Sequence, residues 1–208
     1  LACWLIVAGI VFDFFDGFVA RLLHSPSAIG VQLDSLADVI TSGLAPAAVL
    51  WQVCLQTEPC WLPEAWKLGY GVFVLAAFSA LRLAKFNIDE TQTVEFCGLP
   101  TPAGSLLCAS LGMLWQQGML ALSSDGVLLI AVLTSLLLVS PIRMFALKFH
   151  GFGWRGNEVR YLFLLASIVL IIILRTYAIP VIIVLYIVVS AVRWLCMHSG
   201  NPDKAPKA

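Results

Sequence analysis

The chain has 208 residues, of which 61% are hydrophobic and 12% are charged, and its formal net charge is zero. Soluble domains are nearer half apolar and about a quarter charged, so this composition excludes an ordinary soluble domain and indicates a membrane protein. The balanced charge also argues against a protein that binds nucleic acid through a basic surface.

Apolar stretches of helical length recur along the chain. A helix needs about 20 mostly apolar residues to cross a bilayer. Seven stretches approach or exceed that length: 1–23, 31–55, 66–86, 101–122, 126–142, 159–175 and 178–196. Segments with turn chemistry separate them, such as GLPTP at 98–102. We therefore expect an all-α, polytopic helical bundle forming one membrane domain over residues 1–196, with a disordered cytoplasmic tail over 197–208.

The distribution of basic residues predicts the orientation. If the loop after Arg21 lies in the cytoplasm and the helices alternate, every lysine and arginine except Lys67 and Arg175 falls on the cytoplasmic side. Cytoplasmic loops of membrane proteins carry an excess of such residues. We therefore expect the segment from Asp13 to Asp38 to face the cytoplasm at the cell (inner) membrane.

Four aspartates stand out in this apolar chain. Asp13 and Asp16 are three residues apart, and Asp34 and Asp38 are four apart, so each pair shares one face of a helix. The loop between the two helices is short, which makes them antiparallel neighbours and lets both pairs converge. Carboxylates inside a membrane are costly and repel one another, whereas divalent cations favour sites made of oxygen ligands. The pattern predicts a site for one or two divalent ions, and two ions can clamp a phosphoryl transfer.

Small and basic residues follow the first aspartate pair. Gly17 and Ala20 would let a ligand or helix approach the backbone closely. Arg21 lies four residues after Gly17, on the same side of the helix, where its guanidinium could pair with a phosphate. Arg21 could equally be an anchor of the kind that the positive-inside rule describes. The site is therefore expected to take metals and a phosphorylated ligand.

These positions together form a recognisable motif. The pattern Asp-x2-Asp-Gly-x2-Ala-Arg-x8-Gly-x3-Asp-x3-Asp resembles the signature of the CDP-alcohol phosphotransferases, with its fixed positions at Asp13, Asp16, Gly17, Ala20, Arg21, Gly30, Asp34 and Asp38. The resemblance implies an integral-membrane enzyme with a six-helix core, usually a homodimer. Such an enzyme moves the phosphoryl-bearing part of a CDP-linked donor to an alcohol and releases CMP.

The resemblance also implies a role for each residue of the motif. Asp13, Asp16 and Asp34 would be metal ligands, and Asp38 would both ligate a metal and act as the base. The cofactor would be Mg²⁺ or Mn²⁺, with two ions. The cytidine diphosphate would be held by Asp13, Gly17, Ala20, Arg21 and Gly30.

Two later segments bear on the acceptor. Residues 79–103 and 140–161 resemble the phosphatidylserine synthase branch of the family, which implies CDP-diacylglycerol as donor and L-serine as acceptor. That branch has one more helix before the first one here. The chain also opens directly on apolar residues at Leu1, so we expect it to be N-terminally truncated.

Polar residues in the same two segments are candidates for holding the acceptor or the lipid phosphate. Arg82 and Lys85 are three residues apart and share a helix face. Asn87 follows at the helix end, where it could instead be a cap, and Arg143 belongs to the second segment. For Lys85, plain anchoring at the membrane surface is an equally good explanation, and GLPTP is expected to be a rigid turn rather than a substrate contact.

Two other functions remain open on the residues alone. The same chemistry could act on glycerol 3-phosphate, an inositol phosphate or a second lipid. The basic side chains of Arg82, Lys85 and Arg143 could also bind a phosphorylated acceptor. A cation transporter is the more distant alternative, since aspartates inside membranes can line an ion path. Transport predicts acidic residues spread across the membrane depth, whereas these four cluster near one face.

Overall fold

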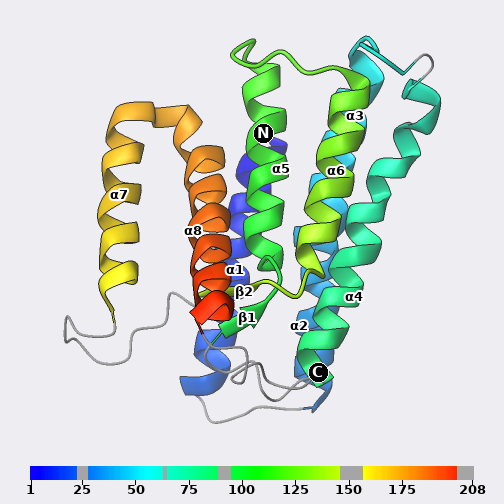
Figure 1. Ribbon diagram of the computed structural model, residues 1–208. Helices are drawn as coiled ribbons and strands as arrows, with labels where there is room; N and C mark the ends of the chain where they lie inside the picture. The colour runs from blue at the N-terminus through cyan, green and yellow to red at the C-terminus, as the bar shows by residue number, and fades with distance from the viewer. Residues whose placement is uncertain (23–27, 63–64, 89–94, 146–156, 201–208) are drawn as a thin grey trace.

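The protein is a bundle of helices, seen in a computed structural model that describes residues 1–22, 28–62, 65–88, 95–145 and 157–200 (Figure 1). The helical elements are α1 (Ala2–Leu22), α2 (Ala28–Asp38), η1 (Val39–Leu44), α3 (Ala45–Gln56), η2 (Ala65–Phe73), α4 (Val74–Ile88), α5 (Thr101–Gln116), α6 (Ser124–Leu138), α7 (Glu158–Leu174), η3 (Arg175–Tyr177) and α8 (Ala178–Gly200). The two strands, β1 (Glu95–Cys97) and β2 (Arg143–Phe145), have three residues each. The predicted class, a helical membrane bundle, is confirmed. Most of the expected tail, residues 201–208, lies outside the described residues.

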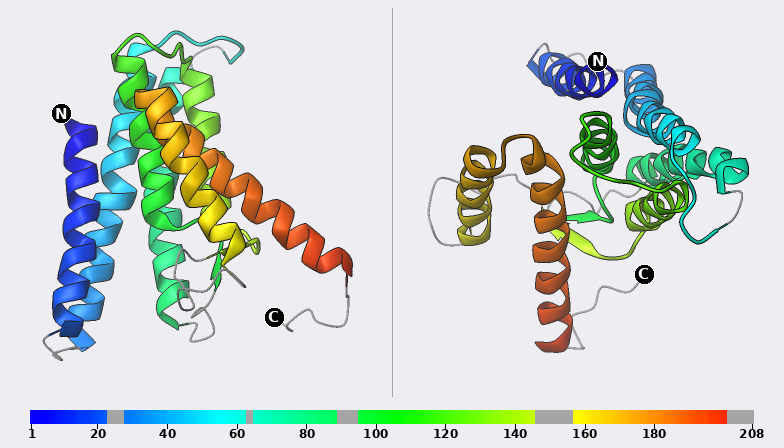
Figure 2. Two further views of the ribbon diagram at one scale, coloured as in Figure 1. Left: turned by 90° about the vertical axis from the view of Figure 1, so that its left-hand side faces the viewer. Right: turned by 90° about the horizontal axis from the view of Figure 1, so that it is seen from above.

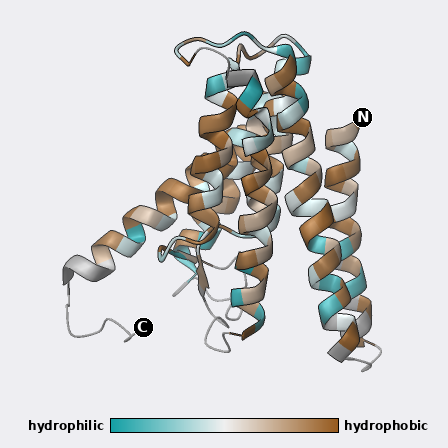
Figure 3. Cartoon of the chain, turned by 90° about the vertical axis from the view of Figure 1, so that its right-hand side faces the viewer, coloured by the Kyte–Doolittle hydropathy of each residue, from teal (hydrophilic) through white to brown (hydrophobic). Residues whose placement is uncertain are grey.

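Several helices have the length and composition of membrane spans. Among the residues that the structure describes, three helical stretches are long and apolar enough to cross a membrane: Gln32–Gln56, Lys67–Ile88 and Glu158–Cys196. Two shorter apolar helices cover Ala2–Asp13 and Ser124–Leu138. Hydrophobic residues cover much of the outer surface of the bundle, and on α1 and α2 the hydrophilic residues gather in the lower half of the view (Figure 3). The number of spanning helices, seven from the sequence, stays a prediction.

Helices α3 to α6 form the centre of the bundle. Helix α3 contacts α5 and α6, and α4 contacts α6. Helix α1 lies against α5 and α3, while α8 packs on α5. Helix α7 contacts α8 and stands at the edge of the molecule (Figures 1 and 2). This arrangement leaves the polar ends of α1 and α2 beside each other at one end of the bundle.

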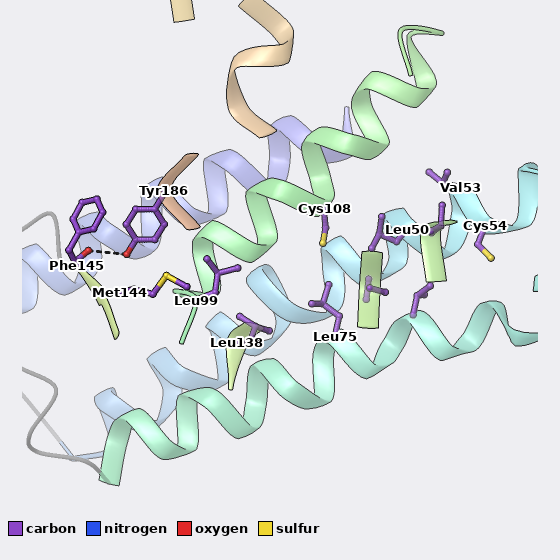
Figure 4. Close-up of a cluster of buried hydrophobic side chains, with 14 of the residues drawn as sticks. Leu50, Val53, Cys54, Leu75, Leu99, Cys108, Leu138, Met144, Phe145 and Tyr186 are labelled. Carbon is purple, nitrogen blue, oxygen red and sulfur yellow. Dashed lines mark hydrogen bonds between the residues drawn. The ribbon is translucent and has the colours of Figure 1, made fainter. Parts of the chain in front are cut away.

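Apolar side chains from these helices form one continuous core (Figure 4). At one end of the core, at the left of Figure 4, the ring centroids of Phe145 and Tyr186 lie 4.9 Å apart. The Tyr186 hydroxyl donates a hydrogen bond to the Phe145 carbonyl over 2.9 Å. Because Tyr186 is in α8 and Phe145 in β2, this contact joins the C-terminal helix to the end of the bundle that holds the strands.

The second long helix is interrupted by a turn of π-helix. Between α2 and α3, residues Val39–Leu44 adopt the wider π conformation, where the sequence predicts one continuous helix over 31–55. Pro46 is at the start of α3 and cannot donate the backbone hydrogen bond that a regular helix needs there. Gly43 packs so closely on Ser79 of α4 that an added Cβ would lie 3.0 Å from the Ser79 Cβ. The wide turn follows directly after Asp38.

A tight turn fixes the start of α5. Gly98 has φ of +76°, and an added Cβ would collide with the backbone carbonyl of Leu138. Its N–H donates to the Ile142 carbonyl over 2.9 Å, and the Leu99 N–H donates to the Leu137 carbonyl over 2.9 Å. Strand β1 pairs antiparallel with β2 directly before this turn. The expected turn at 98–102 is therefore held by the last turn of α6 and by the segment that follows it.

Candidate active site

Three of the four aspartates converge between α1 and α2. Carboxylate oxygens of Asp13, Asp16 and Asp34 all lie within 4.8 Å of one another. Asp13 is partly buried, and the other two side chains are exposed. The structure brings the residues together because their spacing puts each pair on one helix face and the two helices contact each other.

Asp38 adjoins this cluster but lies deeper. It is the last residue of α2, one helical turn beyond Asp34. Its side chain is in hydrogen-bonding contact with that of Asp13. Its Oδ1 atom is buried and has no hydrogen-bond partner. The side chain of Asp38 therefore contacts the acidic cluster, while its Oδ1 can still accept a proton or a hydrogen bond.

The chemistry of the cluster fits a divalent metal ion. Hard cations such as Mg²⁺ and Mn²⁺ take carboxylate oxygens as ligands, and three such oxygens converge here. Four neighbouring carboxylates repel one another unless a cation or a proton lies between them. Asp13, Asp16 and Asp34 would hold the ion, and Asp38 lies one helical turn beyond Asp34.

The remaining motif residues lie on the same two helices. Gly17, Ala20 and Arg21 occupy the last turns of α1, beyond Asp13. The positions of the Ala20 and Arg21 side chains lie outside the described part of the structure. Gly30 is exposed in α2, one helical turn before Asp34. The role of these four residues in nucleotide binding stays a prediction.

Arg82 of α4 is buried inside the bundle. Only 8% of its surface is exposed. Its Nη1 donates a hydrogen bond of 2.8 Å to the Thr101 hydroxyl, and the guanidinium carbon lies 5.8 Å from the centre of the Phe86 ring. Its Nε is buried without a partner, and its charge attracts that of Asp38. A buried guanidinium with an unused N–H is suited to bind a carboxylate or phosphate.

Lys85 and Asn87 lie one turn further along α4. Lys85 is exposed and lines, with Arg82, a pocket of about 380 Å³. The other residues that line it are Ile88, Cys97, Leu138, Val139, Ser140 and Pro141. The Asn87 amide donates to the Ser35 hydroxyl over 2.8 Å, so this residue ties the end of α4 to α2 next to Asp34.

Arg143 belongs to the opposite strand of the small sheet. It lies in register with Cys97, and its side chain is exposed. Cys97 lines the pocket, which puts Arg143 in the neighbourhood of Arg82 and Lys85 but not among the residues that line it. The three cations thus come from two chain segments that the pairing of β1 with β2 brings together.

Comparison with known proteins decides the family. Residues 1–146 match the family model described as CDP-alcohol phosphatidyltransferase. The chain belongs to the CDP-alcohol phosphatidyltransferase family. This confirms the resemblance that the aspartate motif carries.

Curated relatives of the chain share one name, CDP-diacylglycerol–serine O-phosphatidyltransferase. The protein from Helicobacter pylori is 32% identical over 200 residues, which cover 94% of this chain and 80% of the relative. The one from Bacillus subtilis is 34% identical over 146 residues, 70% of this chain and 75% of the relative. The one from Mycobacterium tuberculosis is 35% identical over 220 aligned positions, 98% of this chain and 73% of the relative.

Thr101 contacts a residue of the candidate site but was not singled out from the sequence. Its side chain is fully buried and holds the guanidinium of Arg82. The two residues are 19 positions apart and separated by a loop, so no helical spacing links them. The one available signal was the place of Thr101 between two prolines in the GLPTP turn.

Proposed function

We propose that this enzyme transfers the phosphatidyl group from CDP-diacylglycerol to the hydroxyl of L-serine, giving phosphatidylserine and CMP. The observation that carries the proposal is the convergence of the Asp13, Asp16 and Asp34 carboxylates at the motif positions, with Asp38 and its buried Oδ1 one helical turn beyond Asp34. Membership of the family supports the reaction class. The name shared by the relatives supports CDP-diacylglycerol and serine as substrates.

The acidic cluster is the proposed site for the donor's diphosphate. Two divalent ions, Mg²⁺ or Mn²⁺, held by Asp13, Asp16, Asp34 and Asp38, would supply charge neutralisation for the phosphates. CDP-diacylglycerol enters from the bilayer with its headgroup at this end of the bundle. Its cytidine diphosphate lies along the last turns of α1 and the start of α2, over the motif residues Gly17, Ala20, Arg21 and Gly30.

The acceptor binds beside Arg82 and Lys85, at the pocket that both residues line, with its hydroxyl directed to Asp38. The serine carboxylate binds the unused N–H of Arg82, and Lys85 adds positive charge at the pocket edge. Asp38 takes the proton of the serine hydroxyl on Oδ1. The serine oxygen then forms a bond to the phosphorus attached to diacylglycerol, and the bond from that phosphorus to the CMP oxygen breaks. Asn87 ties the end of α4 to α2 through its hydrogen bond to Ser35, and Arg143 lies opposite Cys97 of the pocket lining, so both would support the pocket rather than take part in the reaction.

The proposed setting is the cytoplasmic face of the inner membrane. L-Serine and CMP are water-soluble and belong to the cytoplasm, and the excess of basic residues predicts that the aspartates face the same side. We further propose a homodimer and a single catalytic membrane domain over residues 1–196, as the family pattern implies.

The decisive experiment measures CMP release by the purified protein in detergent, with CDP-diacylglycerol and Mg²⁺ or Mn²⁺. The acceptor is L-serine, none, glycerol 3-phosphate or inositol phosphate in parallel reactions. Release that depends on serine and stops with a chelator supports the proposal. Release with a phosphorylated alcohol in place of serine would keep the family and overturn the acceptor. Absence of release with every acceptor would overturn the assignment of the acidic cluster as a catalytic site.

A further inference from the structure

We propose that Thr101 is a positioning residue that holds Arg82 in the orientation needed for the acceptor's carboxylate. The inference rests on the proposed function, because it assigns a purpose to the contact between Arg82 and the acceptor. It concerns a residue outside the aspartate motif, at the start of α5. Thr101 touches the arginine and acts through it.

Arg82 needs such a restraint because Asp38 attracts it. The guanidinium is buried, and the field of Asp38 acts on it. An arginine side chain has several rotatable bonds and could turn to pair directly with that carboxylate. Direct pairing would use the N–H groups that the acceptor requires and would occupy Asp38 Oδ1, the proposed proton acceptor. The hydrogen bond from Nη1 to Thr101 opposes this movement, and Nε remains without a hydrogen-bond partner.

Thr101 is itself held rigidly. It follows the Gly98 turn, whose N–H groups are bonded to the Ile142 and Leu137 carbonyls. Pro100 precedes it and Pro102 follows it, which restricts the backbone on both sides. The hydroxyl therefore stands at a fixed point relative to α6 and the sheet. The path from the turn through Thr101 to Arg82 connects the GLPTP segment to the acceptor pocket.

The test compares variants of the full chain in the serine-dependent assay. Thr101→Val removes the hydroxyl and keeps the shape, and we expect it to raise KM for L-serine about tenfold, since hydrogen bonds to charged groups are among the stronger ones. The values of kcat and of KM for CDP-diacylglycerol should stay within about twofold of the parent protein. Thr101→Ser restores a hydroxyl, and we expect it to return KM close to the parent value.

A double variant separates positioning from packing. If Thr101 acts through Arg82, then Thr101→Val should change KM less than about twofold when Arg82→Gln is already present, because coupled residues are not additive. Ser110→Ala is the matched control: Ser110 is a buried hydroxyl in the same helix that donates to its own helix carbonyl at Leu107 over 2.8 Å. This control should behave like the parent protein.

The outcomes are distinct. A parent protein without serine-dependent release overturns the proposed function itself. With an active parent, the positioning role is wrong if Thr101→Val leaves KM for serine unchanged, if Thr101→Ser is as impaired as Thr101→Val, or if the double variant shows additive losses. Should Thr101→Val fail to fold, the same comparison is made between Thr101→Ala and Thr101→Ser, and a difference in KM for serine is again required.

Discussion

Asp38 differs from the other three aspartates of the site in depth and in partners. Asp16 and Asp34 are exposed, whereas Asp38 is partly buried and its buried Oδ1 has no hydrogen-bond partner. Its carboxyl group interacts with the side chain of Asp13 in the cluster and is also attracted by the positive charge of Arg82. This double environment suits a group that helps to bind the donor's metal and also removes the acceptor's proton.

Asp38→Asn should therefore abolish turnover while sparing donor binding. An amide cannot take the proton, and loss of a general base costs about a hundredfold or more in rate. The measurement is CMP release beside retention of labelled CDP-diacylglycerol by the purified protein. Turnover close to that of the parent protein, or donor binding that disappears together with activity, would contradict the assignment of Asp38 as the base.

Asp16→Asn should weaken metal binding instead. Asp16 offers a carboxylate oxygen to the cluster from its exposed side, so the loss of one charged ligand should raise the Mn²⁺ concentration for half-saturation at least about tenfold. The measurement is the paramagnetic resonance signal of free Mn²⁺ during a titration without substrates. Glu158→Gln, a change at an exposed carboxylate in the first turn of α7, is the matched control and should bind Mn²⁺ like the parent. Equal affinities for the two variants would exclude Asp16 as a ligand.

At the scale of single elements, the turn before α5 is the most constrained segment near the site. Gly98 combines a positive φ with a close approach to the Leu138 carbonyl. Gly118, after α5, has a similar φ of +69° but open space around it. These two glycines therefore separate the cost of backbone conformation from the cost of a steric collision.

Gly98→Ala should lower thermal stability in detergent far more than Gly118→Ala. Placing alanine at a positive φ costs about 1 kcal/mol or slightly more, and only Gly98 adds a collision with backbone atoms that cannot move aside. We expect Gly98→Ala also to lose activity, because Thr101 would be displaced. Similar melting temperatures for the two variants would mean that the close approach to Leu138 is relieved at little cost.

At the scale of the whole molecule, the two ends of the bundle carry different chemistry. Helix α2, which carries Asp34 and Asp38, lies at one end of the bundle, and the segment after α3 lies at the other (Figure 1). At that other end the Asp125 carboxylate accepts hydrogen bonds from the Cys60 and Trp61 N–H groups, over 2.9 and 3.1 Å. Cys60 and Cys196 are both free and exposed, and Cys196 is close to the C-terminal end of α8.

A membrane-impermeant thiol reagent should therefore label Cys60 and spare Cys196 in intact cells. Both cysteines should react once the membrane is opened, because the predicted orientation puts Cys196 on the cytoplasmic side with the aspartates. Mass spectrometry of single-cysteine variants would show which of the two cysteines is labelled in intact cells and which only after the membrane is opened. Labelling of Cys196 alone in intact cells would reverse the predicted orientation.

The sequence was most informative where the relevant spacing lies within one helix. Asp13, Asp16 and Asp34 meet as expected because helical periodicity fixes which side chains share a face and the short loop makes the two helices neighbours. The helical membrane class followed from composition, and the aspartate motif identified the family.

Contacts between segments that are far apart in the sequence could not be predicted from local sequence patterns. The bond between Arg82 and Thr101 depends on how the Gly98 turn meets the end of α6. The pairing of β1 with β2 joins residues that are 46 to 50 positions apart. The π-helical turn was hidden in a continuous apolar stretch, although Pro46 was a visible sign that regular helical bonding would fail there.

The π-helical turn changes how far α2 and α3 are rotated relative to each other about the helix axis. Each residue of a regular α-helix advances the chain by about 100°, and a π turn accommodates about one residue more than an α-helical path of the same rotation. A uniform α-helix through the same residues would rotate Asp34 and Asp38 by roughly that angle relative to the face of α3 that packs on α5. The π turn thus allows the half of the helix that carries Asp34 and Asp38 to contact α1 while the other half packs on α5 and α6.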